Sequence, residues 1–332
     1  MTTKDLVPSE ISNLWNTYLS NTMTVWVTRY LLANIQDEEI YNMLKNAEMF
    51  SVKQEEKSKK FLEEAGYPLP DGFDEQDVDV KCQPLYSDNF ILYTKFVLAQ
   101  QGCIFYSMFL VTSINSDIRQ FYEYCWTNSK NIYNQCTDIM VKKGLHHPKL
   151  HVPKPERVDK VDNQSFLAGW FPDRRPLNVQ EISQLEFCFK ATEHNKEFLK
   201  SFAQTSQSKE LRNHFQRGAE ISQKHLEIFQ NILSENDLPH LPTWESEITD
   251  STVAPFSERL MLYKMTLLTG LISTNYGTAL STMMRRDLGL HFIRLRTELL
   301  KYGEDTLNLM IKHEYLDQLP MAKEKPTVHS SE

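Results

Sequence analysis

One stretch decides the fold of this chain: LGLHFIRLRTELLKYGEDTLNL, residues 288–309. Seven of its residues recur at alternating steps of four and three, namely Leu288, Phe292, Leu295, Leu299, Tyr302, Thr306 and Leu309. Because an α-helix has about 3.6 residues per turn, residues at this spacing lie along one face. The stretch is therefore predicted to form a long helix with one buried side.

The chain consists of two similar copies of one repeat, and this stretch belongs to the second copy. The run EISxL at residues 10–14 recurs at 181–185, an offset of 171 residues. YSD at 86–88 recurs as FSE at 256–258, and LY at 92–93 recurs at 262–263, both at an offset of 170 residues. Collinear matches of this kind are the signature of an internal repeat. Each copy is then predicted to have the same structure.

Each copy divides into four helical segments separated by proline and by helix-capping residues. The predicted helices are 8–34, 38–65, 87–111 and 116–143 in the first copy, and 179–204, 209–235, 257–280 and 282–312 in the second. Four long helices with one long connection between the second and third are typical of a ferritin-like four-helix bundle. The predicted fold is all-α, with two tandem ferritin-like four-helix bundles.

The predicted domains follow from the same breaks. Residues 1–144 form the first bundle, 145–176 a proline-rich linker, 177–320 the second bundle and 321–332 a tail. The linker ends in QSFLAGWFPDRRPL, whose large apolar residues are unusual for a free spacer. We expect this end of the linker to dock against the bundles through Phe166, Leu167, Trp170 and Phe171.

Composition and charge exclude several classes. A formal net charge of −8 argues against a nucleic-acid partner, which requires concentrated Lys and Arg. The five cysteines form no CxxC pair, and the start of the chain has no basic-then-apolar signal pattern, so we expect a cytoplasmic location. The most apolar windows, 90–114 and 260–280, are interrupted by Lys95 and Lys264, among other polar residues. They are predicted to be buried central helices without membrane insertion.

Three stretches carry a resemblance to a known family. SFLAGWFPDRRPLNVQEIS (165–183), DSTVAPFSERLM (250–261) and NYGTALSTMMRRDLGLHF (275–292) are similar to signature stretches of the domain-of-unknown-function family numbered 3231, found mainly in spore-forming bacteria. The resemblance covers nearly the whole chain, including its doubling. It implies tandem ferritin-like bundles with a distant likeness to spore-coat proteins, and it supplies no activity.

A ferritin-like fold raises the question of a metal site. Di-iron and di-manganese bundles use glutamates together with Glu-x-x-His pairs, and the chain contains no Glu-x-x-His. A variant set of ligands in the second copy would be His194, Glu220, His225, Glu258, Asp287 and His291. Such a site would hold iron, manganese or zinc.

The first copy serves as a control for these candidates. His194 aligns with Met23 and His291 with Phe121, so both histidines are predicted to face the bundle interior, as is His225. Glu220 aligns with Met49 but stands on the polar side of its helix.

The two acids have a simpler interpretation. Asp287 has a counterpart in Asp117, and Glu258 has one in Asp88. All four are typical of first-turn acids that stabilise a helix dipole.

Two functions therefore remain open. The first is a non-enzymatic structural or interaction protein, spore-associated if the family likeness holds, with protein partners or a homo-oligomer left open and a hydrogen-bonded His/Asp network in the second bundle. The second is a ferritin-like metal-binding protein with oxidase or storage chemistry in the second bundle. The chain has no P-loop, dinucleotide loop or GxSxG, which favours the non-enzymatic role.

Overall fold

The computed structural model describes residues 5–145, 150–169 and 174–322, and all of its long elements are helices. The first half contains α1 (Pro8–Asn34), α2 (Glu38–Glu64), α3 (Asp88–Val111) and α4 (Ser116–Lys142), and the second contains α5 (Val179–Thr205), α6 (Lys209–Ser234), α7 (Glu258–Thr282) and α8 (Arg286–Lys312). The predicted all-α fold of two tandem four-helix halves is confirmed.

One helix boundary differs clearly from its prediction. The fourth helix of the second half was expected to begin at residue 282, but α8 begins at Arg286. The backbone N–H of Arg285 donates to the Glu181 carboxylate instead of continuing a helix. Residues 283–285 therefore form a short connection that is tied to the start of α5.

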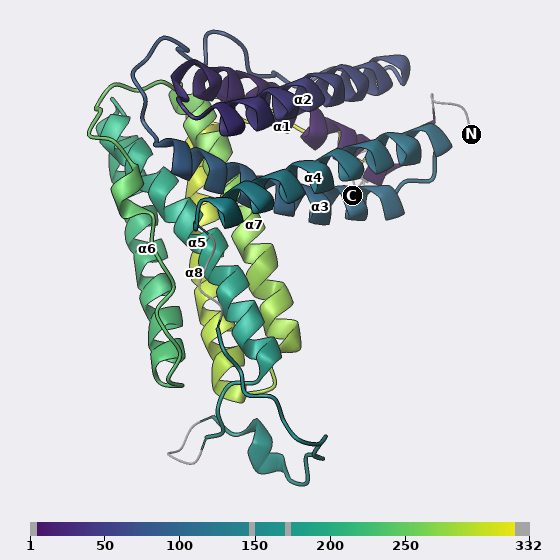
Figure 1. Ribbon diagram of the computed structural model, residues 1–332. Helices are drawn as coiled ribbons and strands as arrows, with labels where there is room; N and C mark the ends of the chain where they lie inside the picture. Colours follow the sequence, from purple (N-terminus) through teal and green to yellow (C-terminus); the bar gives the residue numbers. More distant parts are fainter. Residues whose placement is uncertain (1–4, 146–149, 170–173, 323–332) are drawn as a thin grey trace, which may run out of the picture.

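Each half is built from two helical hairpins (Figure 1). In the first half α1 packs on α2 and α3 packs on α4; in the second, α5 packs on α6 and α7 packs on α8. The helices of the two halves run in steeply different directions, with α3, α5 and α7 near the junction (Figure 1). In the first half the two hairpins diverge as they leave this junction.

The two long crossover connections join the halves. Residues 65–87 link α2 to α3, and residues 235–257 link α6 to α7. Isolated antiparallel bridges pair Val78 with Phe256 and Tyr86 with Ile248. Equivalent segments of the two copies thus bind each other, which makes the junction approximately symmetric.

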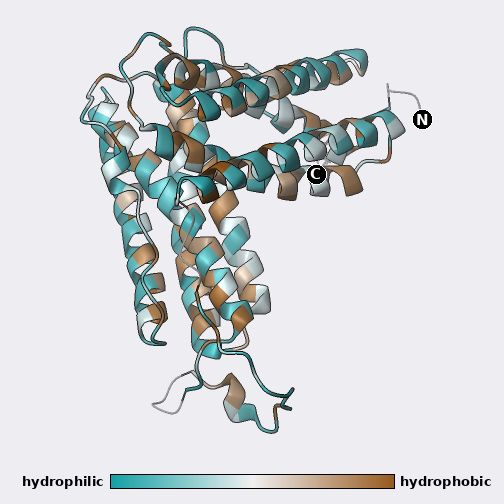
Figure 2. Ribbon diagram, in the orientation of Figure 1, coloured by the Kyte–Doolittle hydropathy of each residue, from teal (hydrophilic) through white to brown (hydrophobic). Residues whose placement is uncertain are grey.

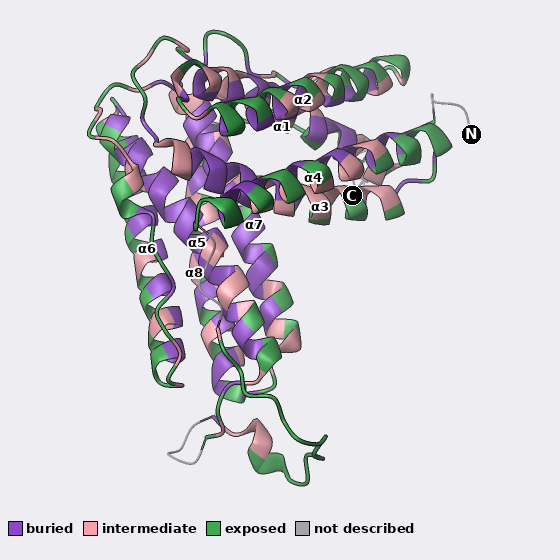
Figure 3. Ribbon diagram, in the orientation of Figure 1, coloured by how far each residue is buried: buried purple, intermediate pink, exposed green. Residues whose placement is uncertain are grey.

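The core runs through the junction. One apolar cluster combines residues of both halves, including Phe90 and Tyr93 of α3 and Phe198 of α5. Figure 2 shows apolar residues along α3 and α7. Figure 3 shows that much of α5 and α7 is buried, as expected for central helices. The stripe on α8 is buried as predicted, except that Leu309 is only partly buried and Met310 is 1% exposed.

No helix within the described ranges is apolar over a length that would cross a membrane.

Candidate functional site

The six residues predicted as metal ligands do not gather at one point. His194 lies among aromatic rings, His225 contacts Tyr276 and Glu298, and Glu220 accepts a hydrogen bond from Gln216 on the exposed side of α6. Over residues 5–145, 150–169 and 174–322, no three His, Cys, Asp or Glu side chains converge in a way that could hold a metal ion. The structure therefore does not bring the six together, although Asp287 lies close enough to His291 for its charge to act on that ring.

His194 is completely buried, as predicted, but it faces the other half of the molecule. Its ring lies 6.2 Å from those of Phe90 and Tyr93 on α3 and 4.9 Å from that of Phe198, measured between centroids. Neither ring nitrogen has a hydrogen-bond partner among the residues that the structure describes. Burial, followed by the nearby Lys264, holds the pKa of His194 well below its ordinary value. His194 is therefore a neutral ring in the apolar junction.

The prediction that the His291 side chain faces the bundle interior is wrong. Its side chain is only partly buried, and its Nδ1 lies 3.5 Å from the guanidinium of Arg294. Phe292, the next residue, takes the place in the core and is 0% exposed. In α4 the aligned residues Phe121 and Tyr122 are both buried, at 2% and 0% exposed, so the repeat alone did not show which of the two positions is buried in α8.

His225 belongs to a buried hydrogen-bonded network. Its Nδ1 lies 3.2 Å from the Tyr276 hydroxyl and its Nε2 lies 3.1 Å from a Glu298 oxygen, while Tyr276 also meets Thr192 at 2.8 Å. A neutral ring satisfies both contacts if Nε2–H donates to Glu298 and Nδ1 accepts from Tyr276. Both ring nitrogens are then paired, which is what a buried imidazole requires.

The first half has the same network with different residues. Tyr106 donates to Gln54 Oε1 at 3.2 Å and meets Asn21 at 3.5 Å. Gln54 aligns with His225, and Tyr106 aligns with Tyr276. In both halves, therefore, hydrogen bonds to one tyrosine hydroxyl connect three helices.

Replacing His225 with glutamine is expected to make the protein less sensitive to acid. Burial lowers the pKa of His225 to about 4 in the folded state, below its ordinary 6.5. Between these values the unfolded chain binds a proton that the folded chain does not, so the free energy of unfolding falls as the pH falls. The full loss from this group is roughly 3 kcal/mol at about 1.4 kcal/mol per pKa unit.

The measurement is urea unfolding of wild type and His225→Gln at pH 8, 6 and 4.5. The variant should match wild type within about 1 kcal/mol at pH 8, because glutamine accepts the tyrosine hydrogen bond as Gln54 does. It should then lose less stability than wild type on acidification. His151→Gln, at an exposed position, is the control. An identical pH profile for wild type and His225→Gln would contradict the buried neutral ring.

Glu258 and its counterpart Asp88 do more than begin a helix. Glu258 Oε1 accepts from the backbone N–H of Ser208 at 2.9 Å and from the Ser206 hydroxyl at 3.3 Å. Asp88 Oδ2 accepts from the N–H groups of Gln36 and Asp37 at 3.1 and 2.7 Å. Each acid thus fastens the hairpin it begins to the turn between the two helices of the other hairpin. Neither is placed as a metal ligand.

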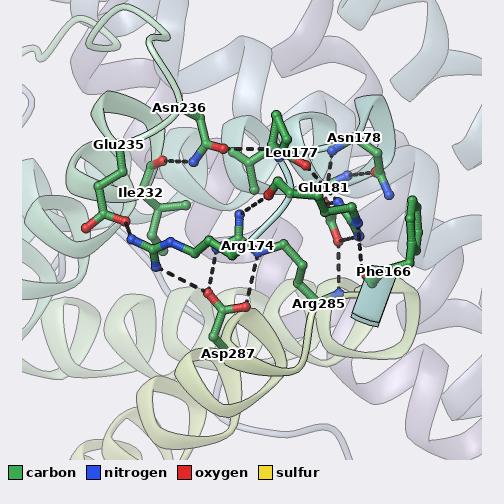
Figure 4. Close-up of polar contacts among 12 residues, drawn as sticks. Phe166, Arg174, Leu177, Asn178, Glu181, Ile232, Glu235, Asn236, Arg285 and Asp287 are labelled. Atoms are coloured by element: carbon green, nitrogen blue, oxygen red, sulfur yellow. Dashed lines mark hydrogen bonds and ion pairs between the residues drawn. The ribbon is translucent and has the colours of Figure 1, made fainter. Parts of the chain in front are cut away.

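Asp287 is also more than a first-turn acid. It is 5% exposed, whereas its predicted counterpart Asp117 is exposed. Its carboxylate receives two hydrogen bonds from the buried Arg285, at 3.1 and 2.6 Å, and lies 3.8 Å from Arg174 (Figure 4). A Cβ added to Gly169 would lie 1.9 Å from Asp287 Oδ1. The linker backbone therefore packs directly on this ion pair.

Glu181 completes this docking site. It is 0% exposed and accepts two hydrogen bonds from the Arg175 guanidinium, at 2.8 and 2.9 Å. It also accepts from the backbone N–H groups of Asn178 and Arg285, each at 3.0 Å (Figure 4). We name Arg174, Arg175, Glu181, Arg285 and Asp287 the linker latch. These residues hold the end of the linker, the start of α5 and the start of α8 in one place.

Two of the four apolar linker residues that were expected to dock, Phe166 and Leu167, lie within the described part of the chain. Phe166 and Leu167 are partly buried, and the Arg175 guanidinium lies 4.1 Å from the centre of the Phe166 ring. Trp170 and Phe171 lie outside the described residues.

A cleft in the first half is the feature most like a binding site. It has a volume of about 600 Å3 and is lined by residues of the hairpins α1–α2 and α3–α4, with α7 of the second half as a further wall. Its apolar walls include Phe50, Leu98, Phe105, Leu267 and Leu271. A smaller space of about 20 Å3 adjoins it, and the two spaces share Met23, Thr24, Lys95, Leu98 and Lys264 in their walls.

Two buried lysines line both spaces, at the place where the cleft adjoins the smaller space. We call this place the inner end of the cleft. Lys95 and Lys264 are each 6% exposed. Lys95 Nζ donates to the Thr28 hydroxyl at 2.8 Å, and Lys264 Nζ lies 5.1 Å from the centre of the Phe198 ring. Within the described part of the chain, Lys264 has neither a hydrogen bond nor an ion pair. Burial lowers the pKa of Lys95 to about 8 and, together with the neighbouring Lys95, lowers that of Lys264 to about 7.

The sequence carried a signal for this site that we interpreted differently. Lys95 and Lys264 interrupt the two most apolar windows, and there they served only to argue against membrane insertion. They are not equivalent positions in the repeat, since Lys264 aligns with Thr94 at an offset of 170 residues. The repeat therefore gave no reason to place them together.

Comparison with known proteins identifies a family. The model of the family described as "Protein of unknown function (DUF3231)" matches residues 1–158 and again residues 165–328. No curated protein matches. Among solved structures, a putative spore coat protein from Bacillus halodurans is similar to part of the chain at 18% identity, with a TM-score of 0.38, covering 46% of this chain and 96% of that one. The chain belongs to the family of proteins of unknown function DUF3231 and contains two copies of its characteristic unit in tandem.

Proposed function

We propose that this protein is a binding protein for a small molecule with an apolar body, which it holds in the cleft between the α1–α2 and α3–α4 hairpins. The cleft carries this proposal. Its volume of about 600 Å3 lies in the usual range for ligand sites, about 300–1,000 Å3. The proposal makes specific the interaction role predicted from the sequence, and the spore-associated role stays a prediction.

The polar groups of the cleft support a ligand rather than empty space. Gln101 and Lys264 line the cleft, and among the described residues neither the Gln101 amide nitrogen nor the Lys264 amine has a hydrogen-bond partner. An unpaired buried polar group costs about 1–3 kcal/mol. Ligand sites combine mostly apolar walls with a few such convergent groups. A bound molecule with an acceptor atom would satisfy them.

Gly270 offers a way to fill the cleft without disturbing the fold. It lies on α7 and lines the cleft, and a Cβ at this position would meet no atom within 4 Å. Gly270→Phe should therefore place its ring in the cleft. Gly270→Ala is the matched control, because it adds helix propensity worth about 0.5–1 kcal/mol without filling the space.

The test is titration with the neutral apolar dye Nile red, followed by its fluorescence. Wild type and Gly270→Ala should bind the dye, and Gly270→Phe should bind at least about tenfold more weakly. Sedimentation velocity of the same three proteins checks whether a second copy occupies the cleft. The proposal is overturned if wild type does not bind the dye, if Gly270→Phe binds as well as wild type, or if Gly270→Phe dissociates a wild-type dimer.

A further inference from the structure

We propose that the ligand of the cleft is an amphipathic carboxylate, with its carboxylate between the Lys95 and Lys264 amines and its apolar chain along the cleft. This inference rests on the proposed function and names the class of ligand. It starts from the position of the two amines at the inner end of an otherwise largely apolar space.

Within the described part of the chain, no carboxylate forms an ion pair with these amines. None of the described residues that line the cleft or the smaller space is Asp or Glu. Glu48 on α2 acts on Lys95 from a distance, but its carboxylate is bound by Arg29 at 3.1 Å and by Lys45 at 2.6 Å. An anion between the lysines would provide the missing counter-charge.

Apart from the more distant Glu48, the other titratable groups around the two amines are neutral near pH 7. Burial raises the pKa of the Cys136 thiol on α4 to about 12. Burial and Lys264 keep the pKa of His194 on α5 well below its ordinary value. Burial also raises the pKa of Tyr86, which lines the smaller space. Lys95 and Lys264 are therefore the groups whose charge changes near neutral pH.

The volume of the smaller space limits how much of an anion can lie beside both amines. A volume of about 20 Å3 admits roughly one water-sized group, since one probe sphere needs about 10–15 Å3. One oxygen of a carboxylate fits this space beside both amines, and the second oxygen then lies in the larger cleft. Lysine also acts as a point charge and needs no planar paired acceptor. The apolar walls of the larger cleft then require a chain attached to that carboxylate.

Binding of a carboxylate should be coupled to the uptake of protons. Both amines lose charge as the pH rises above their lowered pKa values, about 7 for Lys264 and about 8 for Lys95. A carboxylate between them favours the charged forms, so it raises both pKa values. Affinity for the carboxylate should therefore fall between pH 7 and pH 9.5, while affinity for an uncharged analogue should not change.

The experiment compares dodecanoate, dodecanol and dodecylamine by isothermal titration calorimetry below their critical micelle concentrations. Wild type at pH 7 should bind dodecanoate at least about tenfold more tightly than dodecanol, and dodecylamine most weakly. Titrations in buffers of different ionisation enthalpy should show proton uptake with dodecanoate alone. Lys95→Met and Lys264→Met should each weaken dodecanoate binding about tenfold or more and leave dodecanol binding unchanged. Lys53→Met, at an exposed position of α2, is the control for net charge.

The outcomes separate this inference from the proposed function. If dodecanol binds as tightly as dodecanoate, or if dodecanoate binding survives both lysine substitutions, the carboxylate inference is wrong and the cleft still binds an apolar molecule. If none of the three compounds binds and Nile red does not bind either, the proposed function fails and the inference fails with it.

Discussion

Replacing Glu181 with alanine is expected to lower the free energy of unfolding by about 3–5 kcal/mol, the usual cost of removing one partner from a buried ion pair. Glu181 is 0% exposed and accepts four hydrogen bonds at 2.8–3.0 Å, two from Arg175 and two from backbone N–H groups. Its removal leaves the Arg175 guanidinium, whose side chain is 15% exposed, without its carboxylate. The linker latch should open as a result.

The pKa of Glu181 predicts how this contribution depends on pH. Burial alone would raise the pKa, but the hydrogen bonds from Arg175 and from the backbone hold it below its ordinary 4.5. The stabilisation is therefore fully present above pH 4.5 and is lost as the pH falls through the lower, folded-state pKa. Urea unfolding at pH 7 and pH 4 should show a smaller difference between wild type and Glu181→Ala at the lower pH.

Glu10 provides the matched control in the first half. It is also 0% exposed and accepts from the N–H groups of Val7, Ile114 and Asn115 at 3.0, 2.8 and 2.7 Å. Among the described residues it has no ion pair, so Glu10→Ala should cost less than Glu181→Ala. A double-mutant cycle of Glu181 and Arg175 measures the contact between them directly. Equal losses in the two halves would mean that Arg175 does not stabilise the latch.

Replacing Lys196 with methionine should also cost about 3–5 kcal/mol at pH 8, because it removes the nearest cation from two buried carboxylates. Lys196 is 0% exposed, and its Nζ lies 3.0 Å from Glu193, 3.1 Å from Glu197 and 2.8 Å from Glu245. Glu193 and Glu197 are themselves buried. Without Lys196 their charges repel each other in a poorly solvated place.

The loss should be smaller at pH 5 than at pH 8. Burial, followed by the charge of Glu193, raises the pKa of Glu197 to about 7 in the folded protein. The folded chain therefore binds a proton more tightly than the unfolded chain, and the free energy of unfolding falls as the pH rises from about 4.5 to 7. Lys196→Met removes a cation that opposes the protonation of Glu197. At pH 5 Glu197 is protonated in both proteins, so most of its repulsion with Glu193 is absent there.

Urea unfolding of wild type and Lys196→Met at the two pH values tests this. Lys200→Met is the control, because Lys200 is 41% exposed in its side chain and pairs with Glu245 at 2.9 Å. A surface pair of this kind is worth about 0–1 kcal/mol. Adding Glu197→Gln to Lys196→Met should restore part of the stability at pH 8. A loss that is the same at both pH values would contradict the buried carboxylates as its cause.

The stretches that carried the family resemblance lie where distant segments of the chain contact each other. Residues 165–183 and 275–292 meet at the linker latch, where Glu181 accepts from the Arg285 N–H. Residues 250–261 reach the other half, where Arg259 binds Asp77 at 2.7 Å and the Ser257 hydroxyl donates to the same carboxylate at 2.6 Å. The first two stretches therefore join the linker to α5 and α8, the third joins the two halves, and neither lysine of the cleft lies within them.

The sequence by itself determined the eight helices, their doubling and most of their ends. These features are local: a 3.6-residue period, capping residues and prolines act over a few residues and need no knowledge of the rest of the chain. Burial of the stripe on α8 followed from the same local pattern. The all-α class and the two copies could therefore be predicted from the sequence.

Only the tertiary structure decided which polar residues meet. His291 was expected to face inward because it aligns with Phe121, but in the packed structure Phe292 of the periodic stripe occupies the core and His291 is only partly buried. His194 faces α3 because the two halves pack against each other at that point. Lys95 and Lys264 come from non-equivalent positions in different copies and meet for the same reason. Contacts between distant segments depend on how whole helices are oriented, which no local pattern in the chain encodes.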